Sequence, residues 1–506
     1  MIRNHNLPPY LAKVREEIEG YAKDMGLEFF PTIFQLVDYE EMSSTAAYTG
    51  FPNRYPHWQF GMEYNQLKQT RRFGLGTIFE MVINNNPSYA YLLDCNNLIQ
   101  QKLVMAHVYG HVDFFTNNFM FQYTNRKMMD KTANNAAKIR QYIDRYGVEK
   151  VESFMDLVLS LENLIDPTAP FRAKKWKKYK QEGVSKLPVS RPYMETYMNP
   201  KKELKKLEDQ CEAEKKVKRL RLVDEPKRDI LQFLITHAPI EEWQSHIIDI
   251  VREEKYYFTP QGQTQILNEG WACYCHAKIM TERALDSSEI IEFAKVHSSV
   301  ASAGQGRLNP YALGLALLRD IEDRWNKGRH GKEYEECTDM KQKREWNTHE
   351  NKGLEKLFEV RKHYNDIMFI DEFFTQEFVN DQKLFKFGKY DMEDHYEYII
   401  ESKQVDDIKQ TLLSQRTNMG SPFIYIVNGN YQNKGEMLLY HQWEGRTLDM
   451  EYARRTMINL EKIWTRPINL KTCIGQDENT GELKYETLKC KNGKVLSIES
   501  AENEKV

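Results

Sequence analysis

The sequence predicts a mainly helical protein, α+β overall, in which a large helical core precedes a small C-terminal α+β domain. Apolar residues recur at helical spacing over much of residues 9–327, whereas short β-branched and aromatic runs follow residue 420. The length of 506 residues calls for more than one core, because single cores stop growing near roughly 250–300 residues. The 71 basic and 74 acidic residues nearly cancel, so no global field draws the chain to nucleic acid or to an anionic membrane.

Composition shifts divide the chain into five parts. The Lys-rich stretch near the middle is polar enough to be an exposed linker, and the last residues are polar enough to be disordered. The predicted parts are a mostly helical N-terminal domain (1–165), a lysine-rich linker (166–228), a helical region that completes the core (229–365), a C-terminal α+β domain (366–497) and a disordered tail (498–506).

The helical pattern of the core begins at Pro9, and Gly26 ends the first helix. Glycines and prolines predict an ordered, aromatic-rich loop over residues 50–61, and a β-prone run lies within residues 74–95. Helices are then expected at 97–117, 133–165, from 229 onward, 264–285, 287–299 and 309–327, with a break at 257–262 and a surface loop at 328–351.

The C-terminal domain is expected to alternate strands with one helix. Its predicted strands are residues 423–427, 437–443, 468–473 and 484–489, and its predicted helix is 449–464.

The chain is expected to stay in the cytoplasm. Its first residues lack the apolar stretch of a signal peptide, and no window sustains the ~20 apolar residues that span a bilayer. The seven cysteines are odd in number and scattered, which suits reduced thiols better than a disulfide framework.

The best candidate for a functional site is the pair His107 and His111 on the predicted helix 97–117. Side chains at i and i+4 lie on the same face of a helix, close enough to share one metal ion. The spacing alone is a weak signal, because a buried histidine is more often hydrogen-bonded to the backbone than bound to a metal.

A second apolar helix carries Glu269 and, seven residues later, His276, which two helical turns place on one face. The segment Asn268-Glu-Gly-Trp-Ala272 resembles the segment by which gluzincin aminopeptidases supply the glutamate ligand after a His-Glu-x-x-His pair. This resemblance implies a helical, zincin-like core in which His107, His111 and Glu269 bind a divalent metal. Zinc is the metal expected for these ligand types.

The chain departs from the gluzincin pattern at Val108, which stands where the catalytic glutamate would be. A hydrolase would need its general base elsewhere, and the candidates are Asp113, Glu253 and Glu254. Each has a structural alternative. Asp113 would orient a histidine, and the two glutamates would form ion pairs at the surface.

Three further residues are candidates for the surroundings of the metal ligands: His276, Tyr109 and His57. For His57 a structural role is favoured, because Pro- and aromatic-rich loops need polar groups to satisfy their irregular backbone. Nucleotide-driven chemistry is unsupported, since the sequence has no phosphate-binding loop, nucleophile elbow or dinucleotide fingerprint.

Long stretches of the chain carry a resemblance to a known family: residues 47–63, 80–91, 101–115, 250–254, 268–272, 309–311, 320–325 and 417–420, with Trp243, Tyr274, His276, Leu448-Asp449 and Arg466-Pro467. They resemble the SpoVR (stage V sporulation protein R) family, with departures at His246 and Cys275. The resemblance implies a role in the mother cell during formation of the spore cortex, a modified peptidoglycan layer. Relatives in bacteria that do not sporulate are associated with stress and stationary phase.

Two hypotheses for the function remain open. The first is a metal-dependent hydrolase that cleaves a peptide or amide bond in a protein or a peptidoglycan precursor. The second is a non-catalytic metalloprotein or scaffold whose metal site locks the core together. Both exclude nucleic acid as a partner and insertion into a membrane, and the sequence does not determine the oligomeric state.

Overall fold

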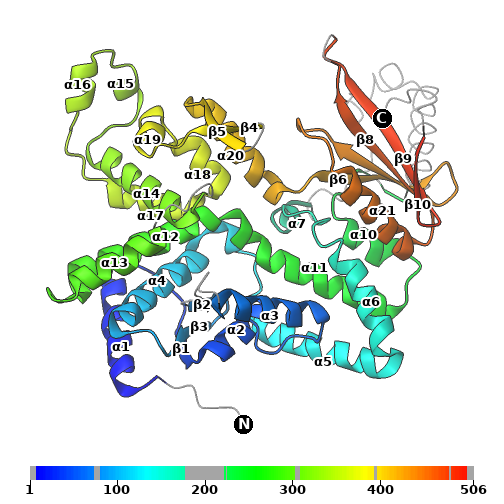
Figure 1. Cartoon of the computed structure of the whole chain (residues 1–506), viewed down its shortest axis with the longest axis horizontal. Coiled ribbons are helices and arrows are strands. Elements are labelled where there is room, and N and C mark those ends of the chain that lie inside the picture. The colour runs from blue at the N-terminus through cyan, green and yellow to red at the C-terminus, as the bar shows by residue number, and fades with distance from the viewer. Residues whose placement is uncertain are drawn as a thin grey trace, which may run out of the picture. The chain divides into compact units, whose positions relative to one another are not determined.

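The structure, a computed structural model, describes residues 7–72, 80–176, 222–223, 225–301, 308–391, 396–477 and 480–498. It confirms a mostly helical chain with a C-terminal sheet domain (Figure 1). Contacts group the chain into unit 1, residues 1–141 and 257–420, and unit 2, residues 142–256 and 421–506. Most of the predicted lysine-rich linker (residues 177–221) and almost all of the predicted tail (499–506) lie outside the described residues.

Unit 1 is built mainly of helices. Two helices contribute residues to both units, α5 (Met128–Tyr146) and α11 (Glu242–Gln263). The others are α1 (Pro9–Asp24), α2 (Tyr39–Ala47), α3 (Trp58–Arg72), α4 (Leu98–Asn117), η1 (Phe119–Phe121), α12 (Gln265–Ile279), η2 (Met280–Ala284), α13 (Ile290–Ala301), α14 (Pro310–Asn326), α15 (Lys332–Glu335), α16 (Met340–Glu345), α17 (Gly353–His363), α18 (Asp366–Phe373), α19 (Gln376–Asp381), α20 (Val405–Arg416) and η3 (Thr417–Gly420).

Unit 1 also contains a three-stranded sheet of order β1-β3-β2, formed by β1 (Thr32–Val37), β2 (Glu80–Ile83) and β3 (Ser88–Leu93). β1 pairs with β3 in parallel, and β2 pairs with β3 antiparallel, which sets Glu80 opposite Leu92. An apolar cluster that includes Val37, Phe51 and Ile83 packs against this sheet. A separate hairpin joins β4 (Lys386–Asp391) to β5 (Tyr396–Ser402).

The helices α4, α12 and α14 lie side by side, with α12 in contact with both of the others (Figure 1). Glycines permit these contacts. A Cβ atom on Gly110 of α4 would lie 2.8 Å from Ala272 Cα, and one on Gly270 of α12 would lie 2.4 Å from the carbonyl carbon of Gly314 on α14. Because real Cβ atoms do not approach backbone so closely, the three helices require glycine where they touch.

The predicted break at residues 257–262 is wrong, since α11 continues through Pro260 to Gln263. Tertiary packing outweighs the local signal here. Tyr257 is buried against Phe51, with ring centroids 5.6 Å apart, and its hydroxyl donates to the carbonyl of Asn84 at 3.0 Å. The helix ends at Thr264, where the backbone leaves helical geometry.

Unit 2 contains a five-stranded sheet of order β10-β9-β8-β7-β6, on which α21 (Met450–Trp464) packs. Its strands are β6 (Phe423–Tyr431), β7 (Glu436–Gln442), β8 (Ile468–Gln476), β9 (Leu483–Lys491) and β10 (Lys494–Ile498). Only β7 and β8 pair in parallel, because α21 connects them. The other helices in the described residues of this unit are α6 (Val148–Leu159), α7 (Ala169–Trp176) and α10 (Ile230–His237).

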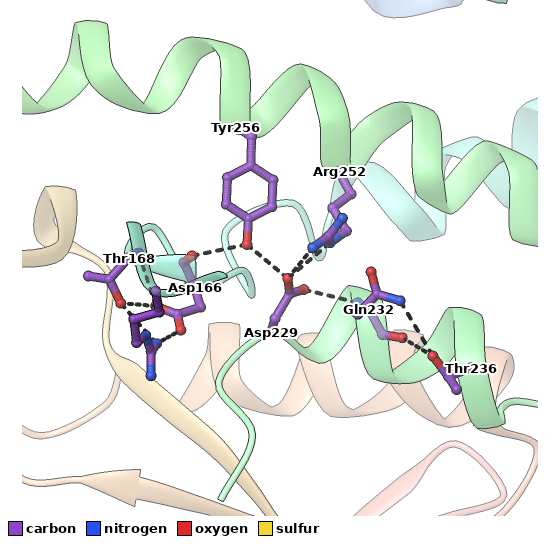
Figure 2. Close-up of polar contacts among 8 residues, drawn as sticks. Asp166, Thr168, Asp229, Gln232, Thr236, Arg252 and Tyr256 are labelled. Atoms are coloured by element: carbon purple, nitrogen blue, oxygen red, sulfur yellow. Dashed lines mark hydrogen bonds and ion pairs between the residues drawn. The ribbon is translucent and has the colours of Figure 1, made fainter. Parts of the chain in front are cut away.

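A polar network joins the helices of unit 2, as Figure 2 shows. Asp229 caps α10 by accepting from the backbone of Gln232 at 2.9 Å. The other oxygen of Asp229 accepts from Arg252 of α11 at 2.8 and 2.9 Å and lies 2.8 Å from the Tyr256 hydroxyl. Each acidic oxygen of Asp229 is therefore satisfied by a structural donor, and the network is fully explained by helix packing.

None of the helices in the described ranges combines the length and the low charge that crossing a bilayer requires.

The glycine contacts predict a specific loss of stability. We expect Gly314→Ala to lower the free energy of unfolding by about 3 kcal/mol, because its methyl group would lie 2.2 Å from the carbonyl oxygen of Ile266. Gly20→Ala in α1 is the matched control, since no atom lies within 4 Å of its new methyl group and alanine favours a helix by up to about 1 kcal/mol. Urea unfolding measures both variants. Equal stability of Gly314→Ala and wild type would contradict the required close approach.

Candidate metal centre

The helix α4 presents His107 and His111 on the same face. A capping box begins this helix, in which the Asn97 side chain accepts from the backbone of Gln100 and the Gln100 side chain accepts from the backbone of Asn97. The helix is buried on most sides, as its broad apolar pattern predicts, and His107 and His111 are only 3% and 7% exposed. Imidazoles buried this deeply need polar partners.

The helix α12 brings Glu269 to the same place. Its N-terminus has no cap from Thr264, but the carboxylate of Asp366 on α18 accepts from the backbone of Ile266 at 3.0 Å and of Leu267 at 2.9 Å. This contact fixes the start of α12 and hence the position of Glu269 two residues further on.

The side chains of His107, His111 and Glu269 converge. Glu269 Oε2 lies 3.4 Å from His111 Nε2 and 3.7 Å from His107 Nε2. Both His107 Nε2 and Glu269 Oε2 are buried, and neither makes a hydrogen bond to any residue within the described ranges. Two imidazole nitrogens and a carboxylate oxygen therefore face one another, and neither His107 Nε2 nor Glu269 Oε2 has a hydrogen-bond partner among the described residues.

The far nitrogen of each ring has a hydrogen-bond partner of its own. His111 Nδ1 lies 3.1 Å from the side-chain oxygen of Asn268, which can only accept, so Nδ1 donates, and the neutral form of the ring then has its lone pair on Nε2. His107 Nδ1 lies 2.9 Å from His276 Nδ1, and His276 Nε2 lies 2.8 Å from His297 Nδ1. When His107 donates to His276 and His276 donates to His297, the lone pair of His107 Nε2 also faces Glu269.

Electrostatics show that this space attracts positive charge. Burial lowers the pKa of His111, but the Glu269 carboxylate outweighs burial and raises that pKa above its ordinary value. Burial raises the pKa of Glu269, but His111 and His107 hold it well below its usual range. Burial and the neighbouring His107 keep the pKa of His276 well below its ordinary value, which suits a neutral hydrogen-bonding ring.

Three residues near the site were missed by reasoning from the sequence: Glu80, Tyr311 and His297. Glu80 opens β2, and its Oε1 lies 3.6 Å from His107 Nε2. Tyr311 near the start of α14 stacks on His107 at 6.3 Å between ring centroids, and burial together with the Glu269 carboxylate raises the pKa of its hydroxyl. Glu80 and Tyr311 stand in segments that carry the family resemblance, but nothing in their spacing connects them to α4.

Cys273 lies in a second group of donor atoms, together with His107 and His276, all within 4.8 Å of one another. Burial raises the pKa of the Cys273 thiol, and the Glu269 carboxylate raises it further. The thiol therefore stays protonated, whereas metal ligation needs the thiolate. Imidazole and carboxylate groups are the better ligands in this cluster.

The structure gives Asp113 a different place from that expected of a base. Its Oδ2 accepts from Trp271 Nε1 at 2.9 Å, and its Oδ1 accepts from the backbone of Glu28 at 2.8 Å and pairs with Arg361 at 3.3 Å. Burial raises the pKa of Asp113 to about 6. These contacts occupy both oxygens in joining α4, α12 and α17.

The other predicted residues also have defined places. The Tyr109 hydroxyl donates to Glu19 of α1 at 3.2 Å, so the structure does not bring it to the two histidines. His57 is buried in its loop, where Nδ1 accepts from a backbone amide at 3.3 Å. Glu253 and Glu254 lie on the part of α11 that belongs to unit 2, whereas His107, His111 and Glu269 belong to unit 1.

The donor set fits a divalent metal. Two imidazole nitrogens and a carboxylate oxygen that face one buried space are the ligand types of catalytic zinc sites, which bind the neutral form of histidine. The far ring nitrogens hydrogen-bond to the Asn268 side-chain oxygen and to His276, and such contacts orient metal-binding histidines. The fold and site thus define a mostly helical protein with a buried His-Glu centre and a separate C-terminal sheet.

This chain belongs to the SpoVR family, because residues 6–421 match the family described as SpoVR like protein. The match ends where the C-terminal sheet of unit 2 begins. The chain is also similar to the uncharacterized protein YcgB of Escherichia coli (strain K12), with 34% identity over 339 residues. That alignment spans 62% of this chain and 63% of YcgB, less than two thirds of either. No solved structure matches the chain.

The contact that starts α12 predicts a pH dependence. Burial raises the pKa of Asp366 to about 6, even though two backbone amides stabilise the carboxylate. The folded state therefore holds this proton more tightly than the unfolded state, and the free energy of unfolding falls as pH rises from about 4 to about 6, by on the order of 3 kcal/mol.

We expect Asp366→Asn to remove this fall, because the amide side chain does not ionise. The measurement is urea unfolding of both proteins between pH 4 and pH 7. Asp371→Asn, at an exposed position of the same helix, is the control and should follow wild type. Parallel curves for wild type and Asp366→Asn would show that Asp366 does not titrate in this range.

Proposed function

We propose that this SpoVR-family chain is a metal-dependent protein that acts in formation of the spore cortex, in the cytoplasm of the mother cell. Membership of the family supports an association with sporulation. The cortex is a modified peptidoglycan layer, so the substrate is proposed to be a protein or a peptidoglycan precursor with peptide or amide bonds.

The proposed cofactor is a divalent metal, with zinc expected, bound by His107, His111 and Glu269. One observation carries this proposal. His107 Nε2 and Glu269 Oε2 are buried and make no hydrogen bond to any other described residue, although they lie only 3.7 Å apart. Leaving such groups without a partner costs about 1–3 kcal/mol each, and more when charged, and a bound cation would satisfy both.

The proposed reaction is hydrolysis. A metal at this place would lower the pKa of a water molecule and polarise the carbonyl group of the substrate. The water oxygen would bond to the carbonyl carbon of the substrate. A proton of the water would pass through a carboxylate next to His107 and His111 to the amide nitrogen as the C–N bond breaks. Burial and Glu269 raise the pKa of Tyr311, so its hydroxyl stays protonated and can donate to the developing oxyanion.

The second candidate is a metal-stabilised scaffold or regulatory protein that acts in sporulation or in the stress response. It is favoured by Val108 at the position of the usual base and by the structural contacts that occupy both oxygens of Asp113. In that case the metal would join α4 and α12 and the site would have no catalytic water.

We expect purified protein to contain about one equivalent of metal per chain, and His107→Ala, His111→Ala and Glu269→Ala to lose it. Metal content by mass spectrometry and circular dichroism of the same samples make the measurement. His330→Ala is the control, because His330 stacks on Trp325 and pairs with Glu350 and should leave metal content unchanged. Equal metal in wild type and in all three ligand variants would rule out both candidates as stated.

The two candidates differ in their behaviour toward substrate. If the chain is a hydrolase, metal-loaded protein should cleave peptide-containing peptidoglycan precursors, and a chelator or His111→Ala should abolish cleavage. The products are identified by mass spectrometry. Metal-loaded, folded protein that releases no product from these precursors would favour the scaffold.

A further inference from the structure

The cluster holds a second carboxylate, which no helical spacing could reveal. Glu80 is the first residue of β2, and its pairing opposite Leu92 of β3 fixes its backbone. Strand β2 packs against α4, and Glu80 Oε1 lies 3.6 Å from His107 Nε2. Donor atoms of Glu80, His107 and His111 all lie within 4.8 Å of one another.

Three separations between donor atoms lie close to the edge length of a tetrahedral coordination site. Around a tetrahedral ion with ligand bonds of about 2.0–2.1 Å, neighbouring ligand atoms lie about 3.3–3.4 Å apart. The observed separations are 3.4 Å from His111 to Glu269, 3.7 Å from His107 to Glu269 and 3.6 Å from His107 to Glu80. Glu80 therefore stands at the same kind of distance from His107 as the Glu269 ligand does.

The charges of the cluster require a cation. Glu80 and Glu269 are only 20% and 19% exposed. Within the described ranges, no lysine or arginine forms an ion pair with either one, and the two histidines are their ionisable partners. Metal ligation needs both imidazoles neutral, and two carboxylates with two neutral imidazoles then carry a charge of −2, which one divalent ion balances.

We propose that Glu80 is the fourth protein ligand, so that the centre is a His2Glu2 site for a divalent cation formed by α4, α12 and β2. This inference rests on the metal site of the proposed function and extends it. A fourth protein ligand changes what the centre can do, because a catalytic water must then enter as a fifth ligand, as zinc allows in transition states.

Cobalt binding tests the role of Glu80 without a substrate. Co²⁺ is titrated into metal-free full-length protein, and visible absorption reports both affinity and ligand geometry. We expect Glu80→Gln to weaken Co²⁺ binding by about tenfold or more and to change the absorption bands. Glu80→Asp retains a carboxylate and should keep part of the affinity. Glu19→Gln on α1, at 28% exposure, is the matched control and should behave as wild type.

Each outcome distinguishes this inference from the proposed function. If Glu80→Gln binds Co²⁺ with wild-type affinity and spectrum while His107→Ala does not bind, Glu80 is not a ligand and the three-ligand site stands. If His107→Ala also binds as wild type, the metal site itself is refuted. Thermal unfolding of the metal-free variants checks that they fold. If Glu80→Gln misfolds, Glu80→Asp decides instead. Wild-type Co²⁺ affinity and wild-type absorption bands for Glu80→Asp would then overturn the proposal.

Discussion

The close approach of α4 to α12, and of α12 to α14, is the constraint on which the rest of the centre depends. It is possible because Gly110 faces Ala272 and Gly270 faces Gly314. His111 and Glu269 are the immediate neighbours of Gly110 and Gly270 in the sequence. These close backbone contacts therefore determine how near α4 comes to α12. The distance between the two helices in turn decides whether an imidazole of α4 and a carboxylate of α12 could share one ion.

The negative charges of buried and half-buried acidic side chains in this protein are balanced in two different ways. Asp113 pairs with Arg361 in unit 1, and Asp229 pairs with Arg252 in unit 2, and both use their remaining oxygens to accept hydrogen bonds. The carboxylates of Glu80 and Glu269 follow another pattern, because the side chains paired with them are the imidazoles of His107 and His111. Asp113 and Asp229 are therefore each paired with an arginine, whereas Glu80 and Glu269 face groups that carry a charge only when protonated.

Part of the fold followed from local patterns. The helix of His107 was predicted at residues 97–117 and is observed at Leu98–Asn117, because a capping box and an apolar pattern both indicate it. The predicted break at residues 257–262 failed, because burial of Tyr257 in the core of unit 1 stabilises a helix through Pro260. Two strands of the three-stranded sheet, β2 and β3, lie within the β-prone run predicted at residues 74–95, whereas β1 was not predicted, since its parallel pairing with β3 joins strands far apart in the sequence.

The sequence by itself determined that His107 and His111 share a helical face and that Glu269 lies on a second buried helix. Those relations depend only on the 3.6-residue period of the α-helix and on apolar spacing. Only the tertiary structure decided that Glu80 joins them and that Asp113 serves as a joint between helices. The reason is physical: a strand and helices distant in sequence meet through packing and backbone pairing, and no local pattern encodes which of their side chains will face one another.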